Sequence, residues 1–138
     1  MLFKEIRSMA RPRHENPTPA ELEILQVIWH RGPSTVREVM NVLNERKRRA
    51  YTSVMSLMTV MAEKGQLRQK PRGRAFVYSA RISRARTQSR MVRDLLRRVF
   101  NGSTSTLVTQ LLRQAEPDSE EMEEIRKTIA EFSRKKEN

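Results

Sequence analysis

The order of hydrophobic patterns in the first half of the chain restricts its fold more than any other feature. Three short segments repeat apolar residues every three or four positions, as amphipathic helices do. The first begins at Thr18 and ends before Gly32, the second begins at Thr35, and the third covers roughly residues 51–64. Two shorter segments follow in which apolar and polar residues alternate, as in strands. This order predicts three helices followed by a hairpin, a mainly helical α+β fold.

The first two helices carry strong start signals. Pro19 follows Thr18, and Glu21 lies three residues after Thr18, which is the arrangement of a capping box. Thr35 and Glu38 repeat this spacing at the second helix. The apolar positions expected along the three helices are Leu22, Ile24, Leu25, Ile28, Trp29, Val36, Val39, Met40, Leu43, Val54, Leu57, Met58 and Met61.

The third helix has an unusual outward face. Thr52, Ser56, Thr59 and Glu63 are spaced four, three and four residues apart, so they lie opposite the apolar stripe. Small hydroxyl side chains allow a helix to approach base edges in a DNA major groove closely. An ordinary solvent-exposed face is the other interpretation, and these residues alone favour neither. Ala50 is a poor N-cap for this helix.

A cluster of basic residues joins the two expected strands, which cover residues 66–69 and 75–79. The connecting sequence is Lys70-Pro71-Arg72-Gly73-Arg74, whose three cationic side chains favour contact with phosphates. Without such a contact, the segment would be an ordinary solvent-facing hairpin. We expect three aromatic side chains to be buried, namely Trp29, Phe76 and Tyr78.

Three further helical patterns follow the hairpin. Residues 101–103 interrupt them once, and Pro117-Asp118 starts the last helix. Lone short helices are marginal in water, so their apolar faces need a partner. A second copy of the chain is the simplest one, and packing onto the first half in a monomer is the alternative. The predicted dimer interface consists of Val92, Leu95, Leu96, Val99, Leu107, Val108, Leu111, Leu112, Met122, Ile125, Ile129 and Phe132.

These patterns divide the chain into three parts. Residues 1–16 show no sustained period and are expected to form a flexible N-terminal arm. Residues 17–81 form the helical domain with the hairpin, and residues 82–138 form the helical dimerisation domain.

Positive charge is concentrated in two regions. The 138 residues include 28 Lys and Arg against 16 Asp and Glu, a net charge of +12. Residues 46–74 hold nine basic residues and one acidic residue, residues 81–98 are also basic, and residues 115–138 are acidic. Such a balance indicates a polyanion partner, most commonly nucleic acid. The low aromatic content of 5% argues against RNA-binding surfaces built by base stacking.

The sequence lacks the residues that several classes of function require. The chain has no cysteine, and its two histidines have no partner at metal-ligand spacing. No Gly-rich phosphate loop or Ser/His/Asp motif is present. We therefore expect neither enzymatic activity nor a bound cofactor or metal. No apolar run approaches the roughly 20 residues of a membrane span, and no secretory signal is recognisable, so we expect a cytoplasmic protein.

Several motifs resemble the penicillinase repressor family, which includes the β-lactamase, methicillin-resistance and copper-transport repressors. The resemblance covers about residues 17–135. The matching stretches are TPAELEILQVIW (18–29), AYTSVMSLM (50–58), EKGQL (63–67), GRAFVY (73–78) and FNGS with the Leu-Val and Leu-Leu pairs that follow (100–112).

This resemblance implies a winged helix-turn-helix repressor that binds a palindromic operator in double-stranded DNA as a homodimer. It implies that the third helix enters the major groove and that basic residues contact phosphates. The base-facing residues would be Tyr51, Thr52, Ser53, Met55, Ser56 and Thr59. The phosphate contacts would be Thr18, Arg46, Arg48, Arg49, Lys70, Arg72 and Arg74.

The resemblance also bears on regulation. In the β-lactamase branch a sensor-linked protease cleaves the repressor, and the break at residues 100–106 is the corresponding candidate here. Members of the copper-responsive branch carry a cysteine cluster, which this chain lacks. Two rival functions share some of these features. A nonspecific nucleic-acid-binding or packaging protein would show no preference among duplexes, and an adaptor that reads a protein partner would not need the basic clusters.

Overall fold

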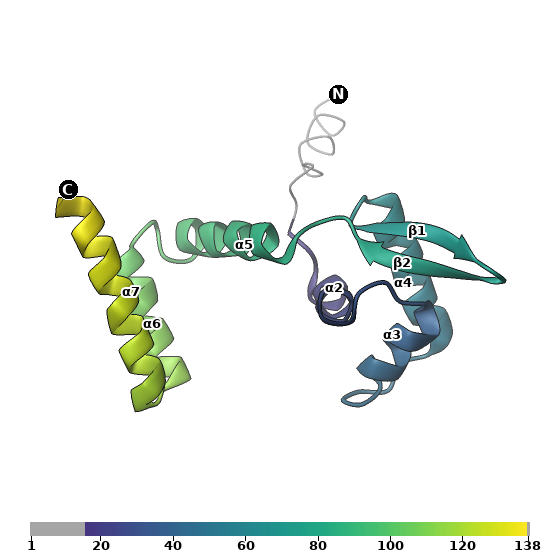
Figure 1. The fold of residues 1–138 in the computed structure, drawn as a ribbon, viewed down its shortest axis with the longest axis horizontal. Coiled ribbons are helices and arrows are strands. Elements are labelled where there is room, and N and C mark those ends of the chain that lie inside the picture. Colours follow the sequence, from purple (N-terminus) through teal and green to yellow (C-terminus); the bar gives the residue numbers. More distant parts are fainter. Residues whose placement is uncertain (1–15, 138) are drawn as a thin grey trace, which may run out of the picture. The chain divides into compact units, whose positions relative to one another are not determined.

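A computed structural model describes residues 16–137, which contain six helices and one two-stranded antiparallel sheet (Figure 1). The arm predicted for residues 1–16 lies, apart from its last residue, outside this range. The elements in chain order are α2 (Pro19–Arg31), α3 (Val36–Leu43), α4 (Tyr51–Glu63), β1 (Leu67–Arg72), β2 (Ala75–Ala80), α5 (Arg84–Arg98), α6 (Thr104–Ala115) and α7 (Ser119–Glu137).

The chain divides into two compact units between Met91 and Val92. Within the described residues, we call 16–91 the N-terminal unit and 92–137 the C-terminal unit. Helix α5 crosses the boundary between them. No helix in the described part of the chain is both long and apolar enough to cross a membrane.

Helices α2 and α3 both begin with the predicted capping boxes. The Glu21 amide donates to Thr18 Oγ1 at 3.2 Å, and the Thr18 amide donates to Glu21 Oε1 at 2.9 Å. Thr35 and Glu38 make the same two hydrogen bonds at 3.2 and 2.9 Å. Helix α2 ends before Gly32, whose φ of 91° suits glycine. These signals confirm the predicted starts and the predicted end of α2.

The core of the N-terminal unit lies between α2, α3, α4 and the base of the hairpin. Val27 is buried although its position was not predicted, whereas Leu22, Met40 and Leu57 are only partly buried. Trp29 is also partly buried, and its indole N–H donates to the Ile82 carbonyl at 3.0 Å. The buried apolar cluster is Ile24, Leu25, Val27, Ile28, Val36, Val39, Leu43, Val54, Met58, Met61, Leu67 and Tyr78.

The end of α4 is fixed to the rest of the unit. Gly65, at φ 85°, donates to the Ala62 carbonyl at 3.2 Å, and the Gln66 amide donates to the Met61 carbonyl at 2.9 Å. These two bonds form a Schellman motif and end α4 close to residue 64, as the sequence pattern predicted. Ala50, at the other end, makes no side-chain capping bond, as expected.

A buried carboxylate links α2 to this same region. Glu21 is 3% exposed and accepts from Lys64 Nζ at 2.8 Å and from Gln66 Nε2 at 3.2 Å. Burial alone would raise the pKa of Glu21, but the hydrogen bonds from Lys64, Thr18 and Gln66 and the charge of Lys64 hold it below the ordinary value of 4.5. Glu21 therefore joins the start of α2 to the segment between α4 and β1.

The hairpin strands are longer than predicted. They span residues 67–72 and 75–80, so Lys70, Pro71 and Arg72 belong to β1 and the turn is only Gly73-Arg74. Gly73 has φ 63°, which permits a two-residue turn. Among residues 16–137 each of these strands pairs with only one other strand, so both are edge strands. Pro71 is tolerated in β1 because the open side of an edge strand does not require the N–H that proline lacks. We call the hairpin of residues 67–80 the wing.

The prediction that Phe76 is buried is wrong. Phe76 pairs with Pro71 near the turn and is 47% exposed, whereas Tyr78 is 2% exposed. Tyr78 lies closer to the base of the hairpin, where Ser34 exchanges two backbone hydrogen bonds with it at 3.0 and 2.8 Å. Alternation in a strand indicates its two faces but not how far the strand extends beyond the core.

The C-terminal unit has well-defined helix starts but little core. Ser103 accepts from the Thr106 amide at 3.3 Å, and Asp118 accepts from the Glu121 amide at 2.8 Å, as the pattern at Pro117-Asp118 predicted. Helices α6 and α7 do not pack along each other. The large apolar side chains left exposed from α5 onward are Val92, Leu95, Val99, Leu111, Ile129 and Phe132.

Candidate nucleic-acid interface

Helix α4 presents all six predicted base-facing residues to solvent. Its apolar stripe, represented by Val54, Met58 and Met61, is buried against α2 and α3. The opposite face therefore remains available to a ligand. The exposed residues of this face are Tyr51, Thr52, Ser53, Met55, Ser56 and Thr59.

The hydroxyls on this face differ in what they can offer. Thr59 Oγ1 donates to the Met55 carbonyl at 2.8 Å, so its proton is occupied and its oxygen can only accept. The hydroxyls of Thr52, Ser53 and Ser56 have no hydrogen-bond partner among residues 16–137. They can donate or accept, which suits either kind of base edge.

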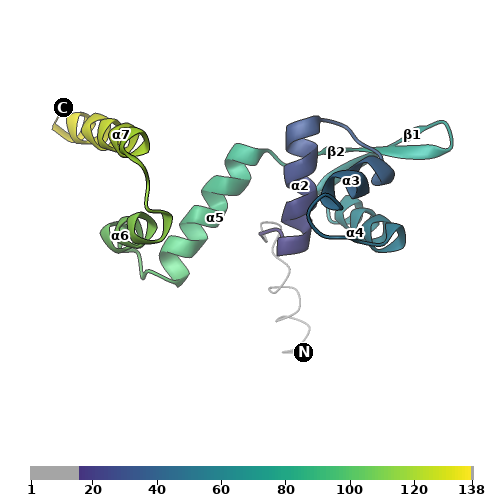
Figure 2. The same cartoon turned by 90° about the horizontal axis from the view of Figure 1, so that it is seen from below.

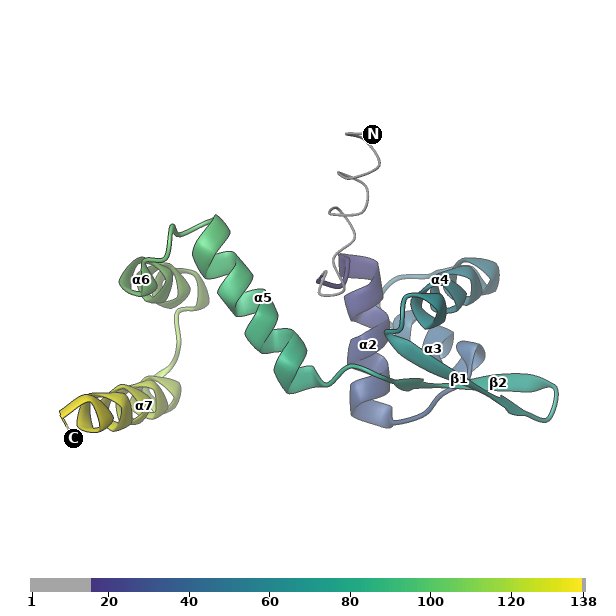
Figure 3. The ribbon, with the colours of Figure 1, turned by 90° about the horizontal axis from the view of Figure 1, so that it is seen from above.

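The wing carries the predicted cations on its outer part. Lys70 and Arg72 lie on β1 and Arg74 lies in the turn, and all three are exposed. The hairpin and α4 lie on the same side of α2, and the turn of the hairpin projects beyond α3 and α4 (Figures 2 and 3). The basic side chains are thus carried by an element that extends past the helices.

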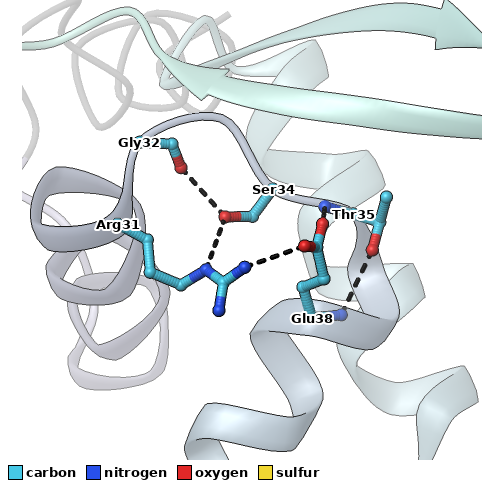
Figure 4. Close-up of polar contacts among 5 residues, drawn as sticks. All are labelled: Arg31, Gly32, Ser34, Thr35 and Glu38. Carbon is cyan, nitrogen blue, oxygen red and sulfur yellow. Dashed lines mark hydrogen bonds and ion pairs between the residues drawn. The ribbon is translucent and has the colours of Figure 1, made fainter.

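A network of polar contacts precedes α3 (Figure 4). Arg31 Nη2 lies 2.8 Å from Glu38 Oε2, and Arg31 Nε donates to Ser34 Oγ at 3.3 Å. Ser34 is fully buried and donates to the Gly32 carbonyl at 2.9 Å. The network fixes the turn between α2 and α3, and sequence reasoning missed it because the pattern marked only Glu38.

The charge of the wing reaches this network. Hydrogen bonds from Thr35 lower the pKa of Glu38, slight burial opposes them, and the charges of Arg31 and Arg72 lower it further. The charge of Arg72 on the wing thus contributes, as the smallest of these causes, to lowering the pKa of Glu38.

The basic loop before α4 is only partly free. Arg46 and Arg48 are exposed. Arg49 is half-buried, with its guanidinium 2.6 Å from Glu23 Oε2 and its amide donating to Asn44 Oδ1 at 2.7 Å. To bind a phosphate, Arg49 would have to break its ion pair with Glu23 or share its guanidinium between Glu23 and the phosphate.

Thr18, the remaining predicted phosphate contact, is exposed at the start of α2. Its oxygen accepts the capping bond from the Glu21 amide, which leaves its hydroxyl proton available to a ligand. The structure therefore keeps five of the predicted cations, at positions 46, 48, 70, 72 and 74, exposed, and holds Arg49 in an ion pair.

A family model described as "Penicillinase repressor" matches residues 17–131. The chain belongs to the penicillinase repressor family. The penicillinase repressor of Bacillus licheniformis is 28% identical over 117 residues, which cover 85% of this chain and 91% of that protein. The penicillinase repressor of Staphylococcus aureus is 20% identical over 116 residues, covering 84% and 92%.

A crystal structure of a transcriptional regulator from Thermotoga maritima also resembles this chain. It is 21% identical, with a TM-score of 0.46, and the match covers 97% of this chain and 82% of that one. The fold assignment here comes instead from the elements themselves and from the family. This penicillinase repressor family member has a winged-helix fold and is a DNA-binding transcriptional repressor; the family is not enzymatic.

One further residue of this family member borders the candidate interface. Arg37, on α3, has its guanidinium carbon 5.1 Å from the centroid of the Tyr51 ring on α4. Arg37 and Tyr51 are too far apart in the sequence to form a local motif, and no helix or strand spacing rule pairs them. Val60 also lies exposed beside Thr59 and was not among the predicted base-facing residues.

Proposed function

We propose that this repressor binds a palindromic operator as a homodimer, with α4 of each copy in the major groove. The observation that carries the proposal is the exposed face of α4, which offers small hydroxyls instead of long charged side chains. The opposite side of the same helix is held in the core by Met58 and Met61, both fully buried. A helix anchored in this way can present its outer face rigidly to a groove.

Base readout is assigned to the exposed residues of α4. Thr52, Ser53 and Ser56 can donate to or accept from base edges, and Thr59 can accept. Met55, which is 40% exposed, supplies an apolar contact suited to a thymine methyl group. Tyr51 stands at the helix start, where its hydroxyl can reach either a base or the backbone.

Phosphate binding is assigned to the wing and the loop before α4. Lys70, Arg72 and Arg74 would contact one strand, and Arg46 and Arg48 would contact the backbone at the start of α4. Thr18 and Arg49 would contribute weaker contacts, since each is already engaged within the protein. Each neutralised phosphate steepens the dependence of log affinity on log salt by about 0.9.

Homodimer formation is assigned to the C-terminal helices. Six of the apolar side chains on these helices are exposed within a single chain, and a second copy can cover them symmetrically. Two α4 helices related by a two-fold axis would then read two inverted half-sites. The proposed interface is the set of apolar residues predicted from the sequence, from Val92 to Phe132, of which Leu107 is already buried within the chain.

Selection from a random library of DNA duplexes tests this function. We expect the recovered sequences to contain an inverted repeat, bound roughly 10³-fold or more tightly than random DNA. Equal binding to all duplexes would instead support a nonspecific packaging protein. Recovery of a single half-site without its inverted copy would argue against the homodimer.

We also propose that a sensor-linked protease releases the repressor by cutting between α5 and α6. Asn101 and Gly102 are exposed there, and exposed connections are the usual sites of cleavage. Limited proteolysis of the purified chain should map the first cut to residues 98–108. A preferred cut elsewhere among the described residues would remove this proposal.

A further inference from the structure

Arg37 carries a positive charge that the interface described above does not use. It is exposed near the start of α3, and its guanidinium lies 5.1 Å from the centroid of the Tyr51 ring. No carboxylate or hydrogen-bond acceptor among residues 16–137 engages this guanidinium. Arg31 and Arg49, by contrast, are ion-paired with Glu38 and Glu23.

The contact with Tyr51 leaves the guanidinium able to bind a second group. A guanidinium over an aromatic ring uses its flat face for that contact, while its N–H donors point outward in its plane. Those donors form a fork that matches two oxygens of one phosphate. Because the ring restricts the side chain beforehand, less conformational entropy is lost when the phosphate binds.

The position of Arg37 identifies the kind of ligand. Helices α3 and α4 form the helix-turn-helix pair, and the first helix of such a pair crosses the DNA backbone when the second lies in the groove. Tyr51 is the first residue of α4, so Arg37 lies beside the end of the predicted groove-facing surface. A phosphate of the adjacent backbone is the anion expected at that place.

We propose that Arg37 binds a DNA backbone phosphate and that the Tyr51 ring positions it. This inference rests on the proposed placement of α4 in the major groove. It adds an anchor on α3 to those on the wing and the loop, and it gives Tyr51 a positioning role besides its proposed contact with DNA.

Binding of the full chain to a fluorescent mixed-sequence DNA duplex, measured over a range of salt concentrations, tests the inference. Arg37→Gln should flatten the log–log salt dependence by about 0.9 for each copy bound. Tyr51→Phe keeps the ring but removes the hydroxyl that is proposed to contact DNA, so it is the reference for the loss of the ring. Relative to Tyr51→Phe, Tyr51→Leu should weaken binding about two- to fivefold, because Arg37 is no longer ordered before the phosphate binds.

Two comparisons keep the test specific. Arg113→Gln removes an exposed arginine from α6 and should leave the salt slope as in the wild type. In the Arg37→Gln background, Tyr51→Leu should bind about as well as Tyr51→Phe, because the side chain that the ring positions is gone. Fluorescence of Trp29, the single tryptophan, reports whether each variant is folded.

The outcomes separate this inference from the proposed function. A wild-type slope in folded Arg37→Gln would overturn the phosphate contact. If Tyr51→Leu binds more weakly than Tyr51→Phe by the same factor with and without Arg37, the positioning role is overturned. Failure of the wild type to bind any duplex would instead overturn the proposed function as a whole.

Discussion

The two units of the chain bury their apolar side chains to different extents. In the N-terminal unit, Leu25, Val39 and Met58 are fully buried by neighbouring elements of the same chain. In the C-terminal unit, Leu107 is the one large apolar side chain of the described residues that is buried, while Phe132 is 67% exposed. The N-terminal unit buries its core within one chain, whereas the C-terminal unit leaves six large apolar side chains exposed.

This difference separates the two tasks of a repressor. A pre-formed winged helix can hold α4 and the wing in a fixed arrangement for reading DNA. Burying an exposed Val, Leu, Ile or Phe is worth about 1.5–3 kcal/mol each, so the open faces of the C-terminal helices can drive association. In the proposed homodimer, two N-terminal units of unchanged fold would bind the DNA together.

The largest expected effect comes from substitutions that prevent association of the C-terminal units and leave the N-terminal unit folded. Polar substitution of Leu95, Leu111 and Ile125 together should yield monomers by sedimentation and lower operator affinity by on the order of 10²-fold or more. Trp29 fluorescence should remain that of the folded N-terminal unit. A wild type that is already monomeric at micromolar concentration would contradict the comparison.

A pair of apolar truncations compares the two units directly. Met58→Ala should lower the free energy of unfolding by about 2–5 kcal/mol, because it leaves a cavity in a closed core. Ile129→Ala, at a position 56% exposed, should change it by less than about 0.5 kcal/mol under conditions where the chain is monomeric. Denaturant titration followed by Trp29 fluorescence and circular dichroism measures both. Equal losses would show that α7 packs within its own chain.

Acid should weaken the N-terminal unit through Glu21. Its folded-state pKa lies below the ordinary 4.5, so its stabilising contribution is present above pH 4.5 and is lost as the pH falls through the folded-state pKa. Glu21→Gln should cost about 1–3 kcal/mol near neutral pH and flatten the pH dependence below 4.5. Unfolding curves measured across acidic pH test this, and parallel pH profiles for both proteins would refute it.

The smallest expected effect concerns helix caps in the two units. Thr35→Ala removes a cap in the packed unit and should cost about 1 kcal/mol of unfolding free energy. Ser103→Ala removes the cap of α6 and should lower helicity slightly without changing the Trp29 transition. Circular dichroism and fluorescence, recorded on the same samples, distinguish the two results. A shift of the Trp29 transition by Ser103→Ala would mean that the units unfold together.

Features set by nearby residues were predictable from the sequence, and features set by distant contacts were not. The caps at Thr18 and Thr35 depend on a partner three residues away, so pattern alone located them. The outward face of α4 followed from helical spacing in the same way. The ion pair between Arg49 and Glu23 joins residues that are 26 positions apart, and no rule based on neighbouring residues predicts it.

The wing illustrates the same limit. Its alternation and its basic residues were visible in the sequence, but its length was not, because the strands extend past the core where no burial pattern marks them. That is why Phe76 proved exposed and why Lys70 and Arg72 lie on a strand instead of in the turn. The contact between Arg37 and Tyr51 depends on how α3 crosses α4, which only the folded unit defines.

The central claim is that α4 reads bases while the wing holds the backbone, and the most direct test is a comparison of two variants across a library of DNA duplexes. Ser56→Ala should change the order of preferred sequences with little change in average affinity. Arg72→Ala combined with Arg74→Ala should keep the order, weaken all duplexes alike and flatten the salt slope by about 0.9 per lost contact. Uniform weakening by Ser56→Ala, with the preference order intact, would contradict the account.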